Sequence, residues 1–551
     1  LGMIARQNND EGKEATAELI SMAMQEYDGE IKAQISRCLG EAQLIEKRGS
    51  ALMHLLRDAS PRVQAYAAIS LGKIKHTPAF PSLLKLIEKN ANQDAHLRHA
   101  CVMGLLGTAT IKQLVELKNH QSDAVQMAAL LTLRRHRSPE IVQFLTASSR
   151  SVSLEGIRAI NDLPIKSVRH AVADILPRYA QASGKVAEFT PMMQRRLVHS
   201  AFRVGGDKNI RALLAYIDSS NTTVDPAQRS EAVRLLGLWN TPPEIDQSVG
   251  RYAPLPKRDN KNVTQILQEE LPKLLIKGNP ATAELLALSS HYKLKLDDVP
   301  PARLLEIARN TIHSSAARAE ALKYVVQNPP TDFAKELAEL VKNKDPLLAS
   351  AALELSAEHA PGACTDLIYS ATRKSRPLLL RQTAWSMMID TGSNKLQQHL
   401  AAAVRDLTAG KGDRECALEI ITSAENQNHT LVVQALGRYK ASLNKKDPLS
   451  PYKVTLFGGN AKAGAELFKS HPAAQCMRCH TTEKNHDAAM AGPNLSNVAE
   501  RGDRLFLLES LVNPNAKVAK GFGTVSAMPP MGLLMTQHEI RDLVAYLATL
   551  E

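Results

Sequence analysis

Aromatic residues are scarce in this sequence: they make up 4% of its 551 residues, whereas hydrophobic residues as a whole make up 44%. A chain of this length can form several domains, but their cores must be built from aliphatic side chains and alanine. Frequent Ala and Leu favour packed α-helices over a β-sandwich or a barrel. We therefore expect an all-α fold.

Long apolar runs are missing as well. A membrane-spanning helix needs roughly 18 or more consecutive apolar residues, and no such stretch occurs, so we expect no transmembrane segment. The sequence begins at Leu1 and shows no charged segment followed by an apolar one, the pattern of an export signal. If the protein is exported, we expect its signal to have been removed or to lie upstream of this sequence.

Cysteines are few, and most of them stand alone. Cys38, Cys101, Cys364 and Cys416 are scattered singly through helical patterns, where small buried residues are expected, so we predict inert core thiols. Only Cys476 and Cys479 are closely spaced. This arrangement excludes a disulfide framework.

Positive charge is in excess but is not clustered. The net charge is +12, yet residues 451–551 are nearly neutral, with ten Lys and Arg against nine Asp and Glu, so the excess lies in the first 450 residues. There the basic residues are dispersed among acidic ones instead of gathering with aromatic side chains on one face. We therefore expect no nucleic-acid partner and interpret the charges as solvated helix faces.

A repeated helix face fills the first part of the chain. An apolar residue is followed four positions later by a small or apolar one, and four later by Leu or Ile. The pattern occurs at Ile31, Ile35 and Leu39; Val63, Ala67 and Leu71; Leu97, Cys101 and Leu105; Val125, Ala129 and Leu133; and Val152, Gly156 and Ile160. Its starts lie 32, 34, 28 and 27 residues apart, which is typical of repeated helix pairs. The period and pattern resemble HEAT-type repeats; a non-repetitive α-domain is the alternative.

The repeats divide the chain into domains. Similar helices recur until about residue 440, so we predict a helical solenoid over residues 1–440, with an irregular proline-rich loop at 241–262. Two prolines and a charge run mark a linker at 441–455, and residues 456–551 form a further domain. A solenoid offers a concave surface that holds a partner or positions another domain.

The terminal domain contains Cys476-Met-Arg-Cys479-His480. A Cys-x-x-Cys-His stretch places two thiols where they match the two vinyl groups of a haem, and the adjacent histidine reaches the iron as proximal ligand. Zinc is an alternative, with His471 and His486 near enough to help, but it needs four ligands and a second Cys-x-x-Cys is missing. A thioredoxin-like dithiol is another alternative, but it would open a helix within a βαβ pattern that this segment lacks.

One helix is expected on each side of this motif. Gly464 and Phe468 lie four residues apart in a short helix, and a terminal helix carries an apolar face at Ile540, Leu543, Val544 and Leu547. The glycine would allow the two helices to cross closely beside a haem, with Tyr546 of the terminal helix packed against it.

These landmarks, together with Gly-Pro-Asn-Leu at 492–495 and Met-Pro-Pro from Met528, resemble a class I monohaem cytochrome c. The resemblance implies one covalent haem c held by Cys476 and Cys479, with His480 as proximal iron ligand. It also implies that the carbonyl of Pro493 accepts the Nδ1 proton of that histidine. A methionine is expected as distal ligand, because a thioether favours reduced iron. Met528, directly before a proline as in the family, is the first candidate; Met531 and an open position are the alternatives.

The sequence of the last hundred residues more narrowly resembles haem-binding proteins of the Planctomycetes and Verrucomicrobia type. The resemblance extends from "HPAAQCMRCH" to "SAMPPMGLLMTQHEIRDLVAYLATL". In that family HEAT-like repeats precede the cytochrome, and larger members carry a propeller similar to quinoprotein sugar dehydrogenases. The resemblance is compatible with this chain being a fragment of a larger, membrane-associated dehydrogenase similar to quinoproteins.

Electron transfer is therefore the expected function, with the solenoid docking a sugar or alcohol dehydrogenase as donor and passing electrons to an acceptor. The sequence holds no distinctive catalytic constellation, since a ligated His480 cannot act as a general base. Covalent haem attachment needs reduced thiols outside the cytoplasm, so we expect a periplasmic or otherwise exported protein. The alternative is a haem-based sensor or binding scaffold with an open sixth iron position.

Overall fold

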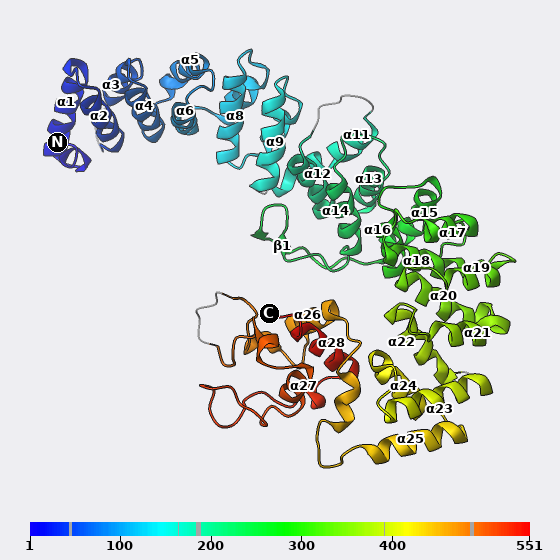
Figure 1. The fold of residues 1–551 in the computed structure, drawn as a ribbon. Coiled ribbons are helices and arrows are strands. Elements are labelled where there is room, and N and C mark those ends of the chain that lie inside the picture. The colour runs from blue at the N-terminus through cyan, green and yellow to red at the C-terminus, as the bar shows by residue number, and fades with distance from the viewer. Residues whose placement is uncertain (43–46, 164, 183–188, 391, 485–489) are drawn as a thin grey trace. The chain divides into compact units, whose positions relative to one another are not determined.

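A computed structural model of the chain describes residues 1–42, 47–163, 165–182, 189–390, 392–484 and 490–551. They divide into two compact units, Leu1–Lys295 and Leu296–Glu551, each built from short helices that pack on their chain neighbours (Figure 1). Within the described ranges the only strands are β1 (Ile245–Asp246) and β2 (Arg251–Tyr252), which pair antiparallel. The predicted all-α class is confirmed.

The first unit holds sixteen α-helices among its described residues. They are α1 Asp10–Gln25, α2 Gly29–Glu41, α3 Arg48–Leu55, α4 Pro61–Lys73, α5 Phe80–Asn90, α6 Ala95–Thr108, α7 Ile111–Glu116, α8 Asp123–Arg135, α9 Arg150–Asp162, α10 Arg169–Ala173, α11 Ile175–Gln181, α12 Pro191–Val204, α13 Asp207–Ile217, α14 Pro226–Gly237, α15 Lys261–Lys277 and α16 Thr282–His291.

The predicted helix face is the buried face of α2, α4, α6, α8 and α9, which contact one another in succession. Ile31 is the exception: it is 44% exposed, whereas Ala33, Ile35 and Leu39 of the same helix are buried. Helix α4 begins at Pro61, where a proline costs no hydrogen bond because the N–H of the first helical residue has no partner within the helix. Just before the helix, the carboxylate of Asp58 accepts a hydrogen bond from the backbone N–H of Ser60 at 2.8 Å.

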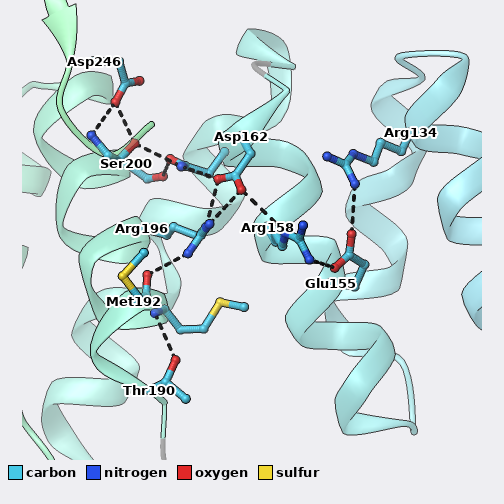
Figure 2. A network of polar contacts seen from close by, with 12 residues as sticks. Arg134, Glu155, Arg158, Asp162, Thr190, Met192, Arg196, Ser200 and Asp246 are labelled. Carbon is cyan, nitrogen blue, oxygen red and sulfur yellow. Dashed lines mark hydrogen bonds and ion pairs between the residues drawn. The ribbon is translucent and has the colours of Figure 1, made fainter. Parts of the chain in front are cut away.

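Ion pairs join consecutive helices on the surface of this unit (Figure 2). Arg134 of α8 pairs with Glu155 of α9 at 3.1 Å, and Arg158 pairs with the same carboxylate at 3.3 Å. One helical turn later Asp162 receives two hydrogen bonds from the guanidinium of Arg196 on α12, at 2.9 and 2.7 Å. Such bidentate pairs fix orientation better than single contacts do. The register between α9 and α12 is therefore set by polar as well as apolar contacts.

The segment at 241–262 is held down by a buried carboxylate. Asp246, 2% exposed, lies 3.0 Å from Nε of Arg203 and 3.4 Å from the guanidinium of Arg169. Burial acts to raise the pKa of Asp246, but the hydrogen bond from Ser248 and the two arginine charges hold it below its usual value. The segment thus packs on α10 and α12 although it has little regular structure.

The second unit holds twelve α-helices among its described residues. They are α17 Pro301–Arg309, α18 Ser315–Val325, α19 Phe333–Leu340, α20 Pro346–His359, α21 Pro361–Ala371, α22 Leu378–Ser386, α23 Asn394–Thr408, α24 Ala417–Glu425, α25 Thr430–Ser442, α26 Ala461–Ser470, α27 Arg504–Val512 and α28 Gln537–Leu547. Four short 3-10 helices matter below: η8 Ser450–Thr455, η9 Cys476–Arg478, η10 Val498–Arg501 and η11 Met531–Leu533.

No helix in the described part of the chain combines the length and the apolar character that crossing a bilayer requires. Three of the four scattered thiols are buried, as expected: Cys101, Cys364 and Cys416. Cys38 differs from the prediction, because its side chain is only half-buried. Burial raises the pKa of Cys101 to about 12 and raises that of Cys416 as well, so both stay protonated and unreactive.

Candidate cofactor site

Helices α26 and α28 cross in close contact at the C-terminal end of the chain (Figure 1, orange and red). A Cβ atom added at Gly464 would lie 2.0 Å from the backbone oxygen of Asp542 and 2.8 Å from Cβ of Tyr546. One turn on, the rings of Phe468 and Tyr546 are 5.7 Å apart. The expectation that glycine permits this crossing is confirmed.

Gly464→Ala is therefore expected to destabilise the packing of α26 on α28 by roughly 1–3 kcal/mol, because the obstacle is backbone that no rotamer change can move. Hydrogen exchange of the α26 and α28 amides measures the loss. Gly437→Ala is the matched control: this glycine also lies in a helix, α25, and nothing comes within 4 Å of an added Cβ. Equal exchange in the two variants would contradict the explanation.

The start of α28 is tied to the end of α26. Thr536 and Glu539 form a reciprocal capping box, and Nε2 of His471 lies 3.5 Å from the Glu539 carboxylate. Hydrogen bonds from Thr536, together with the His471 charge, hold the pKa of Glu539 below its usual value. The loop that follows His471 carries the cysteine motif, so its first residue is anchored.

The cysteine motif is folded as a tight turn. Gln475 adopts the left-handed conformation with φ of 45°, and η9 follows at once. The backbone N–H groups of Cys479 and His480 both donate to the carbonyl of Cys476, at 3.1 and 3.0 Å. Cys476 is half-buried and Cys479 exposed; burial raises the pKa of Cys476. Both thiols and the histidine thus come from one compact turn.

A single hydrogen bond sets the protonation pattern of the histidine. Nδ1 of His480 lies 2.9 Å from the carbonyl oxygen of Pro493. A carbonyl can only accept, so Nδ1 carries the proton and the neutral ring keeps its lone pair on Nε2, the atom available to a metal. The backbone N–H of Gly492 also donates to the carbonyl of Cys479 at 2.8 Å, which holds the two segments together.

Around this turn lies a cavity of about 720 Å³, within the usual range for cofactor sites. Its lining includes Cys476, Cys479, His480, Met528 and Met531. Apolar side chains of α27 and α28 supply much of the remainder, notably Leu507, Leu511, Leu543 and Leu547. The structure thus brings together every residue that the sequence predicts as a cofactor ligand.

The two candidate distal methionines differ in their surroundings. Met531 is 3% exposed and belongs to the apolar core of this region, whereas Met528 is half-buried, with its backbone N–H bound to the Ser526 hydroxyl at 3.1 Å. Met477 is exposed and Met535 is buried in the core. Because both Met528 and Met531 line the cavity, the choice between them remains a prediction.

Sequence reasoning missed the charges of this cavity. Arg501, Lys517 and Lys520 line it, and no Asp or Glu is among its described lining residues. Arg501 is oriented by hydrogen bonds to the carbonyl of Asn494, at 2.7 Å, and to the side chain of Asn497, at 2.5 Å. An apolar cavity with a cationic edge suits a flat apolar group that carries carboxylates. The residues therefore fit a haem, whose macrocycle is apolar and whose propionates are anionic.

The zinc alternative finds no support among the described residues, where no group of three or more His, Cys, Asp or Glu side chains is placed to hold a metal ion. His486, a candidate ligand in that interpretation, lies outside the described residues.

A second cavity, of about 520 Å³ in the first unit, is lined by Arg195, Ala227, Gln228, Glu231, Arg234 and Gln247. Its charged and polar walls do not suit an apolar cofactor.

Comparison with known families now identifies the region around the first cavity. Residues 461–551 match the family model for cytochrome c. The C-terminal part of the chain is a cytochrome c domain. Such a domain binds haem c covalently and exchanges electrons with redox partners, which are the expected cofactor and the expected kind of partner. The tight turn, the Nδ1 proton and the cavity are features of this cytochrome c domain.

Residues 16–105, which run from within α1 to within α6, match the family model for HEAT repeats. HEAT-like repeats are therefore confirmed in this part of the chain, and their predicted continuation to residue 440 remains a prediction. No curated protein matches the chain. Among solved structures, the chain is similar to one described as a homology model of the full-length AP-3 complex in an intermediate open conformation. The TM-score is 0.38 and the identity 12%, over 84% of this chain and 87% of that one.

Gly492 lies directly against the His480 ring of the cytochrome c domain: an added Cβ would come within 2.5 Å of Cε1 and 2.9 Å of Nδ1. Gly492→Ala is therefore expected to push the imidazole away from the Pro493 carbonyl. Losing such an outer partner typically weakens a metal ligand about 10–100-fold. Loss of His480 ligation in the ferric spectrum measures this effect, and Ala491→Ser at the exposed neighbouring position is the control. An unchanged spectrum in Gly492→Ala would contradict the placement of the ring.

Proposed function

We propose that this chain is an electron carrier that uses one covalently bound haem c. A bound haem supplies a reversible one-electron couple at its iron. The observation that carries the proposal is the hydrogen bond from Nδ1 of His480 to Pro493, because it leaves Nε2 free in a cavity that Cys476 and Cys479 also line.

In this proposal each side chain has a separate task. Cys476 and Cys479 hold the cofactor through thioether bonds, and His480 offers Nε2 as proximal ligand. The Pro493 carbonyl fixes the ring orientation and makes the imidazole a stronger donor. Met528 offers its thioether as the distal ligand, with Met531 as the alternative. The apolar walls from α27 and α28 keep water away, which favours the less charged, reduced state.

We further propose that the repeat region docks the redox partners, with a dehydrogenase acting on a sugar or an alcohol as donor and a second protein as acceptor. This rests on the resemblance of the terminal sequence to haem-binding proteins of dehydrogenase systems, and on the wide surface that stacked repeats offer. Covalent haem attachment supports an exported, periplasmic location.

Mixing the purified holoprotein with a dehydrogenase encoded beside it, with and without that enzyme's substrate, tests the function. The expected result is a ferrous spectrum that appears only when substrate is present. An isolated cytochrome c domain that accepts electrons as fast as the full chain would contradict the docking role of the repeats. Failure of every neighbouring dehydrogenase to reduce the full chain would count against the donor class.

A further inference from the structure

The segment that joins the repeats to the cytochrome c domain is packed, not free. Leu449, Ser450, Val454 and Thr455 are all buried. Helix η8, which contains three of them, contacts α24 of the repeats and α28 of the cytochrome c domain. A flexible connection would expose these side chains, so the segment instead forms part of an interface within the second unit.

A buried ion pair crosses this interface. The guanidinium of Arg541 on α28 hydrogen-bonds to Oε1 of Glu419 on α24, and their side chains are 8% and 4% exposed. The second carboxylate oxygen, Oε2, and Nε of Arg541 have no hydrogen-bond partner among the described residues; Asp542 lies 3.9 Å from that Nε, and the His538 ring lies 3.8 Å from Oε1. Each buried charge therefore depends chiefly on the other, and removing one leaves the other uncompensated.

Backbone contacts close the interface beside the ion pair. The amide of Gln382 on α22 donates to the carbonyl of Gly458 at 2.8 Å and to that of Glu415 at 3.1 Å. A Cβ added at Gly458, whose φ is +81°, would lie 1.9 Å from the backbone oxygen of Glu415, so this approach requires glycine. The ring of Phe457 contacts the guanidinium of Arg414, at 4.3 Å, and that of Arg504, at 5.7 Å.

We propose that these contacts form a clamp, defined by Glu419, Gln382, Phe457, Gly458 and Arg541, which fixes the cytochrome c domain to α22 and α24 in one orientation. The cofactor cavity stays outside the clamp, because all of its described lining residues lie between positions 468 and 547 and none belongs to the repeats. Helix α28 contributes to both the clamp and the cavity: Arg541 belongs to the clamp, and Leu543 and Leu547 line the cavity. A redox partner therefore meets a cytochrome held at one angle, and Glu419 acts as a positioning residue through Arg541.

Cutting the connection in the holoprotein tests the clamp without any electron-transfer assay. A recognition sequence for a site-specific protease is inserted between Lys445 and Lys446, both exposed, and gel filtration after cleavage is followed at the haem absorption band. The clamp predicts that haem still elutes with the repeats. If the cleaved chain carries no other change and its haem-containing fragment elutes apart from the repeats, the proposal is overturned, whatever happens to electron transfer.

Single substitutions then assign the clamp to its residues. Glu419→Ala should weaken the association of the cleaved parts on the order of 100-fold or more, so that haem elutes separately. Glu466→Ala, which removes the exposed partner of Lys469, should leave the elution unchanged. The double variant Glu419→Met with Arg541→Met should restore co-elution, because an apolar pair leaves no unpaired charge. Co-elution in Glu419→Ala overturns the role of the ion pair.

A spectrum of the uncleaved variants separates a lost clamp from a damaged domain. An unchanged haem absorption in Glu419→Ala shows that the cavity is intact. If that variant fails to fold, Gln382→Leu removes the two hydrogen bonds from the repeat side alone and is subjected to the same cleavage. If the two fragments of Gln382→Leu co-elute as fully as those of the unaltered chain, the part of the clamp built by the backbone contacts is overturned.

Discussion

Changing both Cys476 and Cys479 to alanine is expected to release all haem from the denatured chain. Both thiols line the same cavity, and in the proposed attachment a thioether to each vinyl group is the only link that survives unfolding. Each single variant should keep one thioether and therefore keep its haem on a denaturing gel. Haem staining of the gel, together with the mass of the intact chain, measures the outcome.

Cys38→Ala is the matched control, since this thiol is half-buried like Cys476 but belongs to the repeats. It should keep the full content of covalent haem. Haem retained by the double variant after denaturation would contradict the attachment, as would release from the control.

Met528→Ala is expected to change the ferric haem from low-spin to high-spin and to lower its reduction potential. A thioether stabilises reduced iron, and axial ligands as a class move haem potentials across about 0.8 V, so a shift on the order of 0.1 V is expected. Absorption spectroscopy and redox titration of the holoprotein measure the two effects.

Met531→Ala is the comparator, because this side chain lines the same cavity but is also part of the apolar core. If Met528 is the ligand, Met531→Ala should keep the low-spin spectrum and lose about 2–5 kcal/mol of stability, as buried Met→Ala changes do. A low-spin spectrum in Met528→Ala together with a high-spin spectrum in Met531→Ala would assign the distal position to Met531. High-spin ferric haem in the unaltered chain would instead favour a sensor with an open sixth position.

The repeats were predictable because their signal is local. Val63, Ala67 and Leu71 repeat at the helical period, and the structure buries all three in α4. The boundary of such a stripe is less predictable: Ile31 continues the pattern of α2 but stays exposed, since whether a neighbouring helix covers a position depends on tertiary packing. The proposed domain limits at 440 and 455 remain predictions.

The cofactor site was predictable to the extent that covalent chemistry fixes spacing. Two thiols and an adjacent histidine must follow each other closely in the chain, so Cys476, Cys479 and His480 could be named from the sequence. Their partners depend on loops, and the short distance from His480 to the Pro493 carbonyl followed only from a family resemblance. Arg501 carried no comparable signal, because a lone arginine in a loop is usually solvated.

The clamp was not predictable from any local pattern. Glu419 and Arg541 are 122 residues apart in the chain, and only the folded structure brings them together. One signal was present: Arg541 directly follows Ile540 on a helix whose neighbouring positions Leu543 and Val544 are apolar and buried. An arginine on such a buried face is costly unless it has a partner, so its position called for a carboxylate elsewhere.

The burial of the repeat cysteines has a consequence for the way the protein matures. In the proposed exported location, the chain would meet oxidants and competing thiols before its cofactor is attached. Cys101 and Cys416, with raised pKa values and no access to solvent, are poor substrates for that chemistry once the repeats have folded. The same folding leaves Cys479 exposed and Cys476 half-buried beside it. Folding of the repeats would therefore leave Cys38, Cys476 and Cys479 open to oxidants, and of these three only Cys476 and Cys479 line the cofactor cavity.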